Sequence, residues 1–116
     1  MSKSLTSELD YSKSDDLTND IINSMVGYFG EEKREEIHKI IWETYIFARD
    51  AHSTQLRKSN EPYITHPLEA AKLLIKLKPD IVTVQSCILH DVIEDTEKNE
   101  TDIEKLFGKD VAEICQ

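Results

Sequence analysis

The sequence predicts an all-α protein, a bundle of short helices. Three observations lead to this fold class. Apolar residues recur at helical spacing in several segments, residues typical of helix starts and stops bound those segments, and no stretch shows a sustained strand pattern or an internal repeat. A length of 116 residues suits one domain with its own core.

Composition limits the classes of partner. The chain has 14 basic and 23 acidic residues, a net charge of -9. Such acidity argues against a general nucleic-acid binder or a binder of anionic membranes, although a local basic pocket for one small anion is compatible with it. We find no signal peptide and no apolar run long enough to span a bilayer. Cys87 and Cys115 lie in apolar helical contexts without a Cys-x-x-Cys motif, which predicts reduced, buried thiols in a cytoplasmic protein.

The first helix is predicted only after a polar segment. Residues 1–16 contain few large apolar side chains, so we expect a mobile polar tail, with the domain formed by residues 17–116. From Leu17 the spacing predicts an amphipathic helix that Asp16 or Thr18 caps and Gly30 stops. Whether this helix packs on the same domain or on another molecule is left open.

Two further helices follow. Residues 31–52 form the strongest helical pattern, with acidic residues at the start, where the helix dipole favours them. Residues 53–63 have the composition of a loop. Pro67 is expected to open the next helix, which ends before Pro79.

The segment from Ile81 onward is nearly all apolar and is expected to run through the middle of the domain. If its helix continues to residue 95, then His90, Asp91, Glu94 and Asp95 share one side of it. Three carboxylates near a helix C-terminus repel one another, so we expect a compensating cation.

Two short helices are predicted near the C-terminus. Thr101 and Glu104 have the spacing of a capping box, and Gly108 would stop the helix they begin. A last helix starts near Asp110 and reaches Gln116. Because the chain ends within an apolar helical pattern, we expect an incomplete domain.

One candidate metal site joins two motifs. His66 precedes Pro67 at a predicted helix start, and His90-Asp91 lies near the end of the following helix, so antiparallel packing could bring them together. Two imidazoles and a carboxylate suit manganese, iron or zinc better than calcium. The alternative is that His66 forms a local cap and His90 is a core histidine with satisfied hydrogen bonds.

Two other groups could carry chemistry. Glu94 and Asp95 could activate water beside a metal, or they could be a solvated helix end. The cations and hydroxyl of Arg57-Lys58-Ser59 could bind a phosphorylated small molecule, or they could belong to a basic surface loop.

The remaining histidines carry less weight. His38 is expected to face solvent. His52 ends an apolar helix face, which favours a structural role or a role in supporting a metal ligand.

The segments 57–71 and 89–96, beginning Arg57-Lys58-Ser59 and Leu89-His90-Asp91, closely resemble the N-terminal hydrolase domain of RelA/SpoT stringent-response proteins, which are HD metal-dependent phosphohydrolases. The resemblance extends from about Ile37 to the C-terminus. Two long motifs in this order are far more specific than a single His-Asp pair.

The resemblance implies an HD-domain helical bundle that hydrolyses (p)ppGpp to GDP or GTP and pyrophosphate, with Mn²⁺ as the usual cofactor. It is the activity of a guanosine-3′,5′-bis(diphosphate) 3′-pyrophosphohydrolase. Carried across by position, the metal ligands are His66, His90 and Asp91. Glu94 and Asp95 would activate and position water, and Arg57, Lys58 and Ser59 would line the nucleotide pocket. Guanosine tetra- or pentaphosphate is therefore the expected partner, with no nucleic acid and no membrane.

The sequence departs from this family in two places. Asn60 replaces the usual glycine, but asparagine tolerates a left-handed backbone. The family's fourth metal ligand is an aspartate in a later helix, beyond the end of this chain. We therefore expect the N-terminal part of an HD hydrolase domain, truncated before its last helices. An HD phosphohydrolase for another nucleotide and a non-catalytic regulatory or interaction module remain alternatives.

Overall fold

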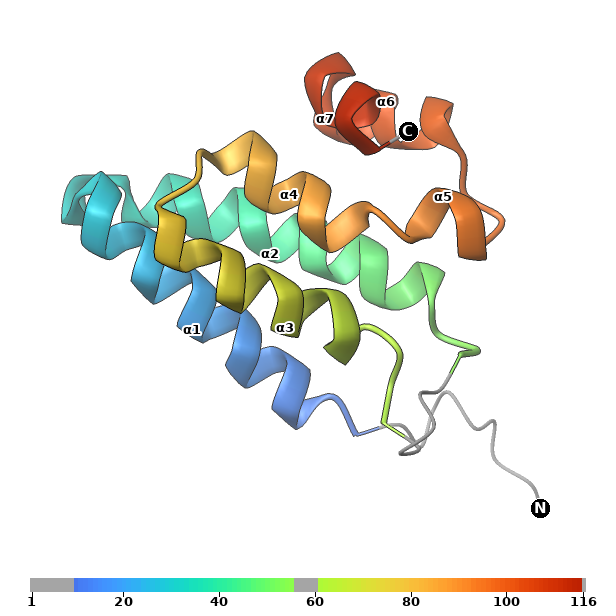
Figure 1. Ribbon diagram of the computed structural model, residues 1–116, viewed down its shortest axis with the longest axis horizontal. Helices are drawn as coiled ribbons and strands as arrows, with labels where there is room; N and C mark the ends of the chain where they lie inside the picture. The colour runs from blue at the N-terminus through green and yellow to red at the C-terminus, as the bar shows by residue number, and fades with distance from the viewer. Residues whose placement is uncertain (1–9, 56–60, 116) are drawn as a thin grey trace.

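Four helices, α1 to α4, form a bundle, and two shorter helices pack at one side of it (Figure 1). The computed structural model describes residues 10–55 and 61–115. The elements are α1 (Ser12–Phe29), η2 (Glu31–Lys33), α2 (Arg34–Ala51), α3 (Thr65–Leu74), η3 (Ile75–Leu77), α4 (Ile81–Leu89), α5 (Val92–Asp95), α6 (Glu100–Phe107) and α7 (Lys109–Cys115).

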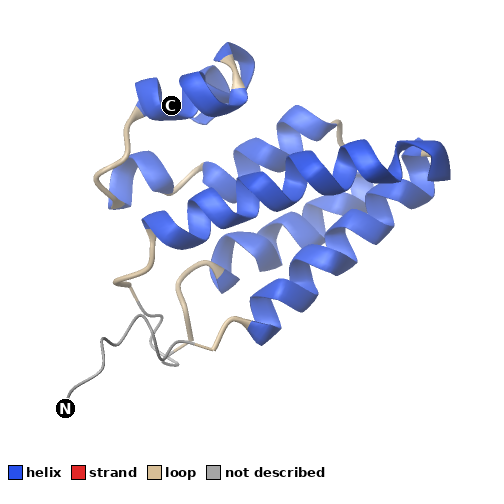
Figure 2. Ribbon diagram, turned by 180° about the vertical axis from the view of Figure 1, so that it is seen from behind, coloured by secondary structure: helices blue, strands red, loops and turns tan. Residues whose placement is uncertain are grey.

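The bundle closes as a ring, because α1 packs on α2 and α3, and α4 also packs on α2 and α3. The regular elements of the described residues are all helical, as Figure 2 shows, which confirms the all-α prediction. None of the helices within 10–55 and 61–115 is long and apolar enough to cross a bilayer. The fully buried core side chains include Ile21, Met25, Ile37, Ile41, Tyr45, Ala48, Leu68, Ala71, Val84, Ile88 and Leu89.

Helix α1 starts earlier than predicted. It begins at Ser12, so a polar tail that reaches residue 16 is wrong for residues 12–16, and residues 1–9 lie outside the described part of the chain. Thr18 is buried inside the helix, where its hydroxyl donates to the Ser14 carbonyl oxygen (2.8 Å), and does not cap it. The predicted stop is confirmed: Gly30 has φ 118° and donates its N–H to Val26.

Helix α3 also begins before its predicted first residue. Thr65 and His66 precede Pro67 in the helix, so proline occupies the third position. Its missing N–H is tolerated there because the first turn of a helix has no intrahelical acceptors for these groups.

The helix predicted over residues 81–95 is interrupted. Helix α4 ends at Leu89, a turn at His90-Asp91 follows, and the single turn α5 covers Val92–Asp95. Both turn residues keep right-handed backbone angles, φ -63° at His90 and φ -89° at Asp91. We call residues 90–95 the acidic turn.

Helices α6 and α7 pack on each other, and α7 packs on α4. The capping box of α6 lies two residues before the predicted one. Asn99 accepts from the Asp102 N–H (3.0 Å), and the Asp102 carboxylate accepts from the Asn99 N–H (3.0 Å). Gly108 does stop this helix, with φ 100°.

Both cysteines are free thiols. Cys115 is buried, whereas Cys87 is half-buried, which is less than predicted. Burial raises the pKa of each thiol, with Asp91 adding to the effect at Cys87.

Candidate functional site

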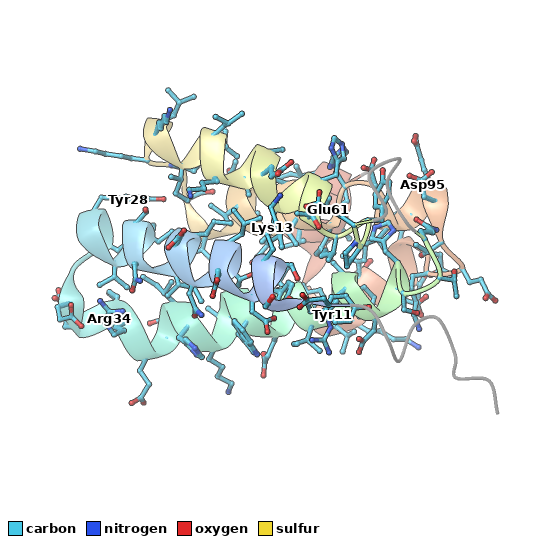
Figure 3. All side chains as sticks on the ribbon, turned by 90° about the horizontal axis from the view of Figure 1, so that it is seen from below. Tyr11, Lys13, Tyr28, Arg34, Glu61 and Asp95 are labelled. Atoms are coloured by element: carbon cyan, nitrogen blue, oxygen red, sulfur yellow. The ribbon has the colours of Figure 1, made fainter. Side chains whose placement is uncertain are left out.

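The candidate site lies at one end of the bundle, where α2 ends, α3 begins and α4 ends. The end of α4 and the start of α3 meet there because these helices pack against each other in opposite directions. Figure 3 shows Asp95 toward this end, and Tyr28 and Arg34 toward the other.

His90 and Asp91 form the centre of the site. The His90 Nε2 and Asp91 Oδ1 atoms are 3.1 Å apart. Asp91 is half-buried, with its side chain 14% exposed, whereas the His90 side chain is 50% exposed. The pair therefore borders solvent on its imidazole side.

The helix end fixes the orientation of the His90 ring. The last carbonyl groups of a helix lack intrahelical partners, and Cys87 supplies one of them at the end of α4. The His90 Nδ1 atom lies 3.0 Å from this carbonyl oxygen. Because a carbonyl oxygen only accepts, Nδ1 carries the proton and donates it. The Nε2 atom that faces Asp91 is then free to bind a proton or a metal ion.

This geometry suits two ligands of one metal ion. Ligand atoms bound at about 2.1 Å, with angles of about 90° to 109° between them, lie about 3.0 to 3.4 Å apart. The Nε2 to Oδ1 distance of 3.1 Å falls in that range. Either a proton on Nε2 or a metal ion between the two atoms is compatible with this distance. A second hydrogen bond that holds a ligating imidazole is also typical of metal sites.

Tyr63 holds the other oxygen of Asp91. The Tyr63 hydroxyl donates to Asp91 Oδ2 (2.8 Å) and lies 3.4 Å from Asp95 Oδ2. Burial raises the pKa of Tyr63, and the two carboxylates raise it further. The phenol thus stays protonated and remains a donor.

His66 lies beside Tyr63. The His66 ring packs edge-on against the Tyr63 ring, with centroids 5.8 Å apart, and its backbone N–H donates to the Tyr63 carbonyl oxygen (2.9 Å). Tyr63 therefore contacts both His66 and Asp91. Within the described residues, no three His, Cys, Asp or Glu side chains are grouped closely enough to hold a metal ion.

His52 and Gln55 support the site from the end of α2. His52 is 1% exposed and packs on the Tyr63 ring, with centroids 4.6 Å apart. Its Nδ1 atom lies 2.9 Å from Gln55 Oε1, and Gln55 Nε2 donates to the Asp95 carbonyl oxygen. Burial lowers the pKa of His52.

The structure describes some of the other predicted residues but not those of the basic loop. Glu94 and Asp95 are both exposed on α5, and the described residues give Glu94 no hydrogen bond or ion pair. Arg57, Lys58 and Ser59, with Asn60, lie outside the described residues. His38 is exposed, as predicted, and stacks on Trp42.

Sequence reasoning missed Tyr63 and Gln55 as parts of the site. Tyr63 precedes His66 by three residues, and Gln55 follows His52 by three. This short spacing from a histidine was the sequence feature that could have identified each of them. The bond that joins them, from the Tyr63 N–H to the Gln55 carbonyl oxygen (3.1 Å), spans a loop and depends on its path.

The fold and the site together define a class of protein. The family profile of the HD domain matches residues 44–116, from within α2 to the C-terminus. The chain belongs to the HD domain family.

Curated relatives place the chain within a narrower group. It is 49% identical over 82 residues to the bifunctional (p)ppGpp synthase/hydrolase SpoT of Escherichia coli K12, which covers 71% of this chain and 12% of SpoT. It is 46% identical over 72 residues to a guanosine-3′,5′-bis(diphosphate) 3′-pyrophosphohydrolase of Vibrio cholerae, covering 62% of this chain and 10% of that enzyme. A GTP pyrophosphokinase of Myxococcus xanthus is 45% identical over 75 residues, which are 65% of this chain and 10% of the relative. The resemblance to RelA/SpoT proteins is confirmed, and the chain spans about a tenth of these relatives' length.

Proposed function

We propose that the chain carries part of a metal-dependent (p)ppGpp hydrolase site, which converts the alarmone to GDP or GTP and pyrophosphate. The observation that carries this proposal is the His90-Asp91 pair, with Nε2 and Oδ1 3.1 Å apart and Nδ1 held by the Cys87 carbonyl oxygen. The similarity to the (p)ppGpp hydrolases supports the choice of substrate.

His90 and Asp91 would hold the metal ion, for which we propose Mn²⁺. His66, which the structure does not bring into one group with them, is the proposed third ligand. Imidazole and carboxylate ligands suit such borderline divalent ions. When bound, the ion would supply positive charge that polarises the phosphate. Arg57, Lys58 and Ser59 would bind the anionic nucleotide by charge and hydrogen bonding.

The acidic turn would handle the protons of hydrolysis. Water attacks the phosphorus that carries the 3′ oxygen, a new P–O bond forms, and the bond to the 3′ oxygen breaks. Glu94 or Asp95 would accept a proton from that water, and a proton would be returned to the departing 3′ oxygen. Exposed carboxylates on a short helix beside Asp91 are accessible to water, as this role requires.

The test follows pyrophosphate release from ppGpp in the presence of Mn²⁺. Because the resemblance implies a fourth ligand beyond this chain, the assay compares the 116-residue chain with a chain extended through that aspartate. We expect the extended chain to release pyrophosphate, with a loss of at least about 100-fold in its Asp91→Ala and His90→Ala variants, because each variant removes a ligand. No release by the 116-residue chain alone would identify it as an incomplete fragment of the site. His38→Ala serves as the control because His38 is exposed on the surface of α2. Release that survives both ligand variants would refute the metal assignment.

Two other results would select the alternatives. Faster cleavage of GTP or of a cyclic dinucleotide than of ppGpp would make the chain an HD phosphohydrolase for another nucleotide. If even the extended chain bound no metal, the domain would be a non-catalytic regulatory or interaction module.

A further inference from the structure

The Tyr63 hydroxyl occupies a central position that the proposed chemistry does not itself use. It has one proton and two carboxylates within reach, Asp91 Oδ2 at 2.8 Å and Asp95 Oδ2 at 3.4 Å. Ionised carboxylates only accept hydrogen bonds, so this proton goes to the nearer carboxylate. The bond to Asp91 is therefore the stronger one, and it is charge-assisted.

The two oxygens of Asp91 have different partners. Oδ1 faces His90 Nε2 at 3.1 Å, and Oδ2 accepts from Tyr63 at 2.8 Å. A carboxylate held at one oxygen cannot rotate to exchange its oxygens without losing that hydrogen bond. Tyr63 thereby fixes which oxygen of Asp91 points to the position shared with His90.

Tyr63 is itself held by contacts on its ring and its backbone. The buried His52 ring packs on one face, with centroids 4.6 Å apart and planes tilted by 36°. The Tyr63 N–H donates to the Gln55 carbonyl oxygen at 3.1 Å. A phenol anchored at its ring and its main chain can position a carboxylate with little loss of conformational entropy on metal binding.

Gln55 links the same support to the acidic turn. Its carbonyl oxygen accepts from Tyr63, and its side-chain amide donates to the Asp95 carbonyl oxygen. Its Oε1 atom lies 2.9 Å from His52 Nδ1. Gln55, four residues after the end of α2, thus ties the position of Tyr63 to that of α5.

We infer that Tyr63 is the positioning residue for Asp91, holding its Oδ1 toward a divalent cation shared with His90, while His52 holds the Tyr63 ring and Gln55 holds the Tyr63 main chain. This inference rests on the proposed function for the presence of the cation. It assigns Tyr63 a role in metal affinity, and no role in proton transfer to substrate.

The direct test measures Mn²⁺ affinity of the 116-residue chain from the electron paramagnetic resonance signal of free Mn²⁺. Tyr63→Phe should weaken binding about tenfold, because loss of a hydrogen bond to a ligand typically weakens metal affinity 10- to 100-fold. Tyr28→Phe is the matched control, since it also removes a hydroxyl that donates at 2.8 Å, here to the Pro79 carbonyl oxygen at another part of the fold. We expect the control to bind Mn²⁺ within twofold of wild type.

A second measurement distinguishes a role of Tyr63 in positioning Asp91 from a general role in maintaining the fold. Raising Mn²⁺ should restore pyrophosphate release in Tyr63→Phe, whereas the double variant Glu94→Gln/Asp95→Asn should stay slow at any Mn²⁺ concentration. Thermal unfolding of both tyrosine variants verifies that the fold persists. Equal Mn²⁺ affinity of wild type and Tyr63→Phe would overturn the inference while leaving the proposed function intact.

Failure of the proposed function gives a different pattern. A chain extended through the later aspartate that binds Mn²⁺ more tightly than its Tyr63→Phe variant but releases no pyrophosphate would refute ppGpp hydrolysis and still support the role of Tyr63. An extended chain that binds no Mn²⁺ would overturn both.

Discussion

Removing the Tyr45 hydroxyl should loosen the first turn of α1. Tyr45 is fully buried on α2, where its hydroxyl donates to the Asp15 carboxylate and lies 2.7 Å from the Ser14 hydroxyl. Burial raises the pKa of Tyr45 well above its usual value, and the Asp15 contact adds to this. The phenol therefore remains a donor, and Tyr45→Phe deletes that donor without changing the packing of the ring.

The cost can be worked out from the partners that remain. Ser14 keeps an acceptor, because its hydroxyl also reaches the Tyr11 carbonyl oxygen at 3.0 Å. Asp15 loses a hydrogen bond to a charged group, which contributes about 1.5 to 3 kcal/mol. Since Asp15 is only half-buried, water replaces part of the loss, so the lower end of that range, about 1.5 kcal/mol, applies.

The assay is urea unfolding of wild type, Tyr45→Phe, Asp15→Ala and the double variant. We expect an unchanged denaturant slope, a lower midpoint, and a coupling energy of about 1 kcal/mol between the two sites. Tyr28→Phe provides a scale, because its hydroxyl donates to a neutral carbonyl, worth about 0.5 to 1.5 kcal/mol. If the double variant loses as much free energy of unfolding as Tyr45→Phe and Asp15→Ala lose together, the Tyr45–Asp15 bond does not anchor the helix.

This anchor bears on the site. Lys13, in the same turn of α1, pairs with Glu61 at 2.8 Å and with Glu69 at 3.5 Å, as the labelled Lys13 and Glu61 in Figure 3 illustrate. Exposed ion pairs of this kind contribute about 0 to 1 kcal/mol, so the Tyr45 hydroxyl holds the turn more firmly than Lys13 does. The segment that the turn contacts leads directly into Tyr63.

Two further predictions concern stability. Asp80→Ala should cost about 1 kcal/mol in urea unfolding, because Asp80 caps α4 by accepting from the Thr83 N–H at 2.8 Å, and Asp80→Asn should retain most of that stability. His52 should make the fold sensitive to acid: burial holds its pKa below the usual 6.5, so only the unfolded chain gains a proton just below that pH. The hydrogen bond to Gln55 raises the pKa of His52, and so do the carboxylates of Asp91 and Asp95. These effects do not cancel the lowering by burial. The free energy of unfolding is then fully maintained above pH 6.5 and falls toward pH 5.5, and the fall should be smaller in His52→Asn but unchanged in the exposed control His38→Asn.

The helices were predictable from sequence to the extent that their signals are local. Gly30 and Gly108 stop their helices as predicted, because each adopts a positive φ that other residues rarely reach. The start of α1 was missed because its buried face begins with Ser14, a residue that composition classes as polar. Ser14 is satisfied by Tyr45, 31 residues away, and no local pattern encodes that contact.

The capping box of α6 shows a different limit. Thr101 with Glu104 and Asn99 with Asp102 both fit the spacing of such a box, and they overlap in sequence. The structure uses Asn99, where the backbone is extended with φ -130°. A motif alone does not decide between two candidate starts when the preceding turn sets the backbone angles.

The break between α4 and α5 is where local structure and chemistry meet. A continuous helix would pair the Cys87 carbonyl oxygen with the backbone N–H of Asp91, four residues on. Because α4 ends at Leu89, that oxygen is available to the His90 Nδ1 atom at 3.0 Å. The His90 Nε2 atom is thereby directed to Asp91. The sequence analysis placed His90 and Asp91 on one side of a helix continued to residue 95, but it could not give this orientation, since the orientation depends on the helix ending one residue before His90.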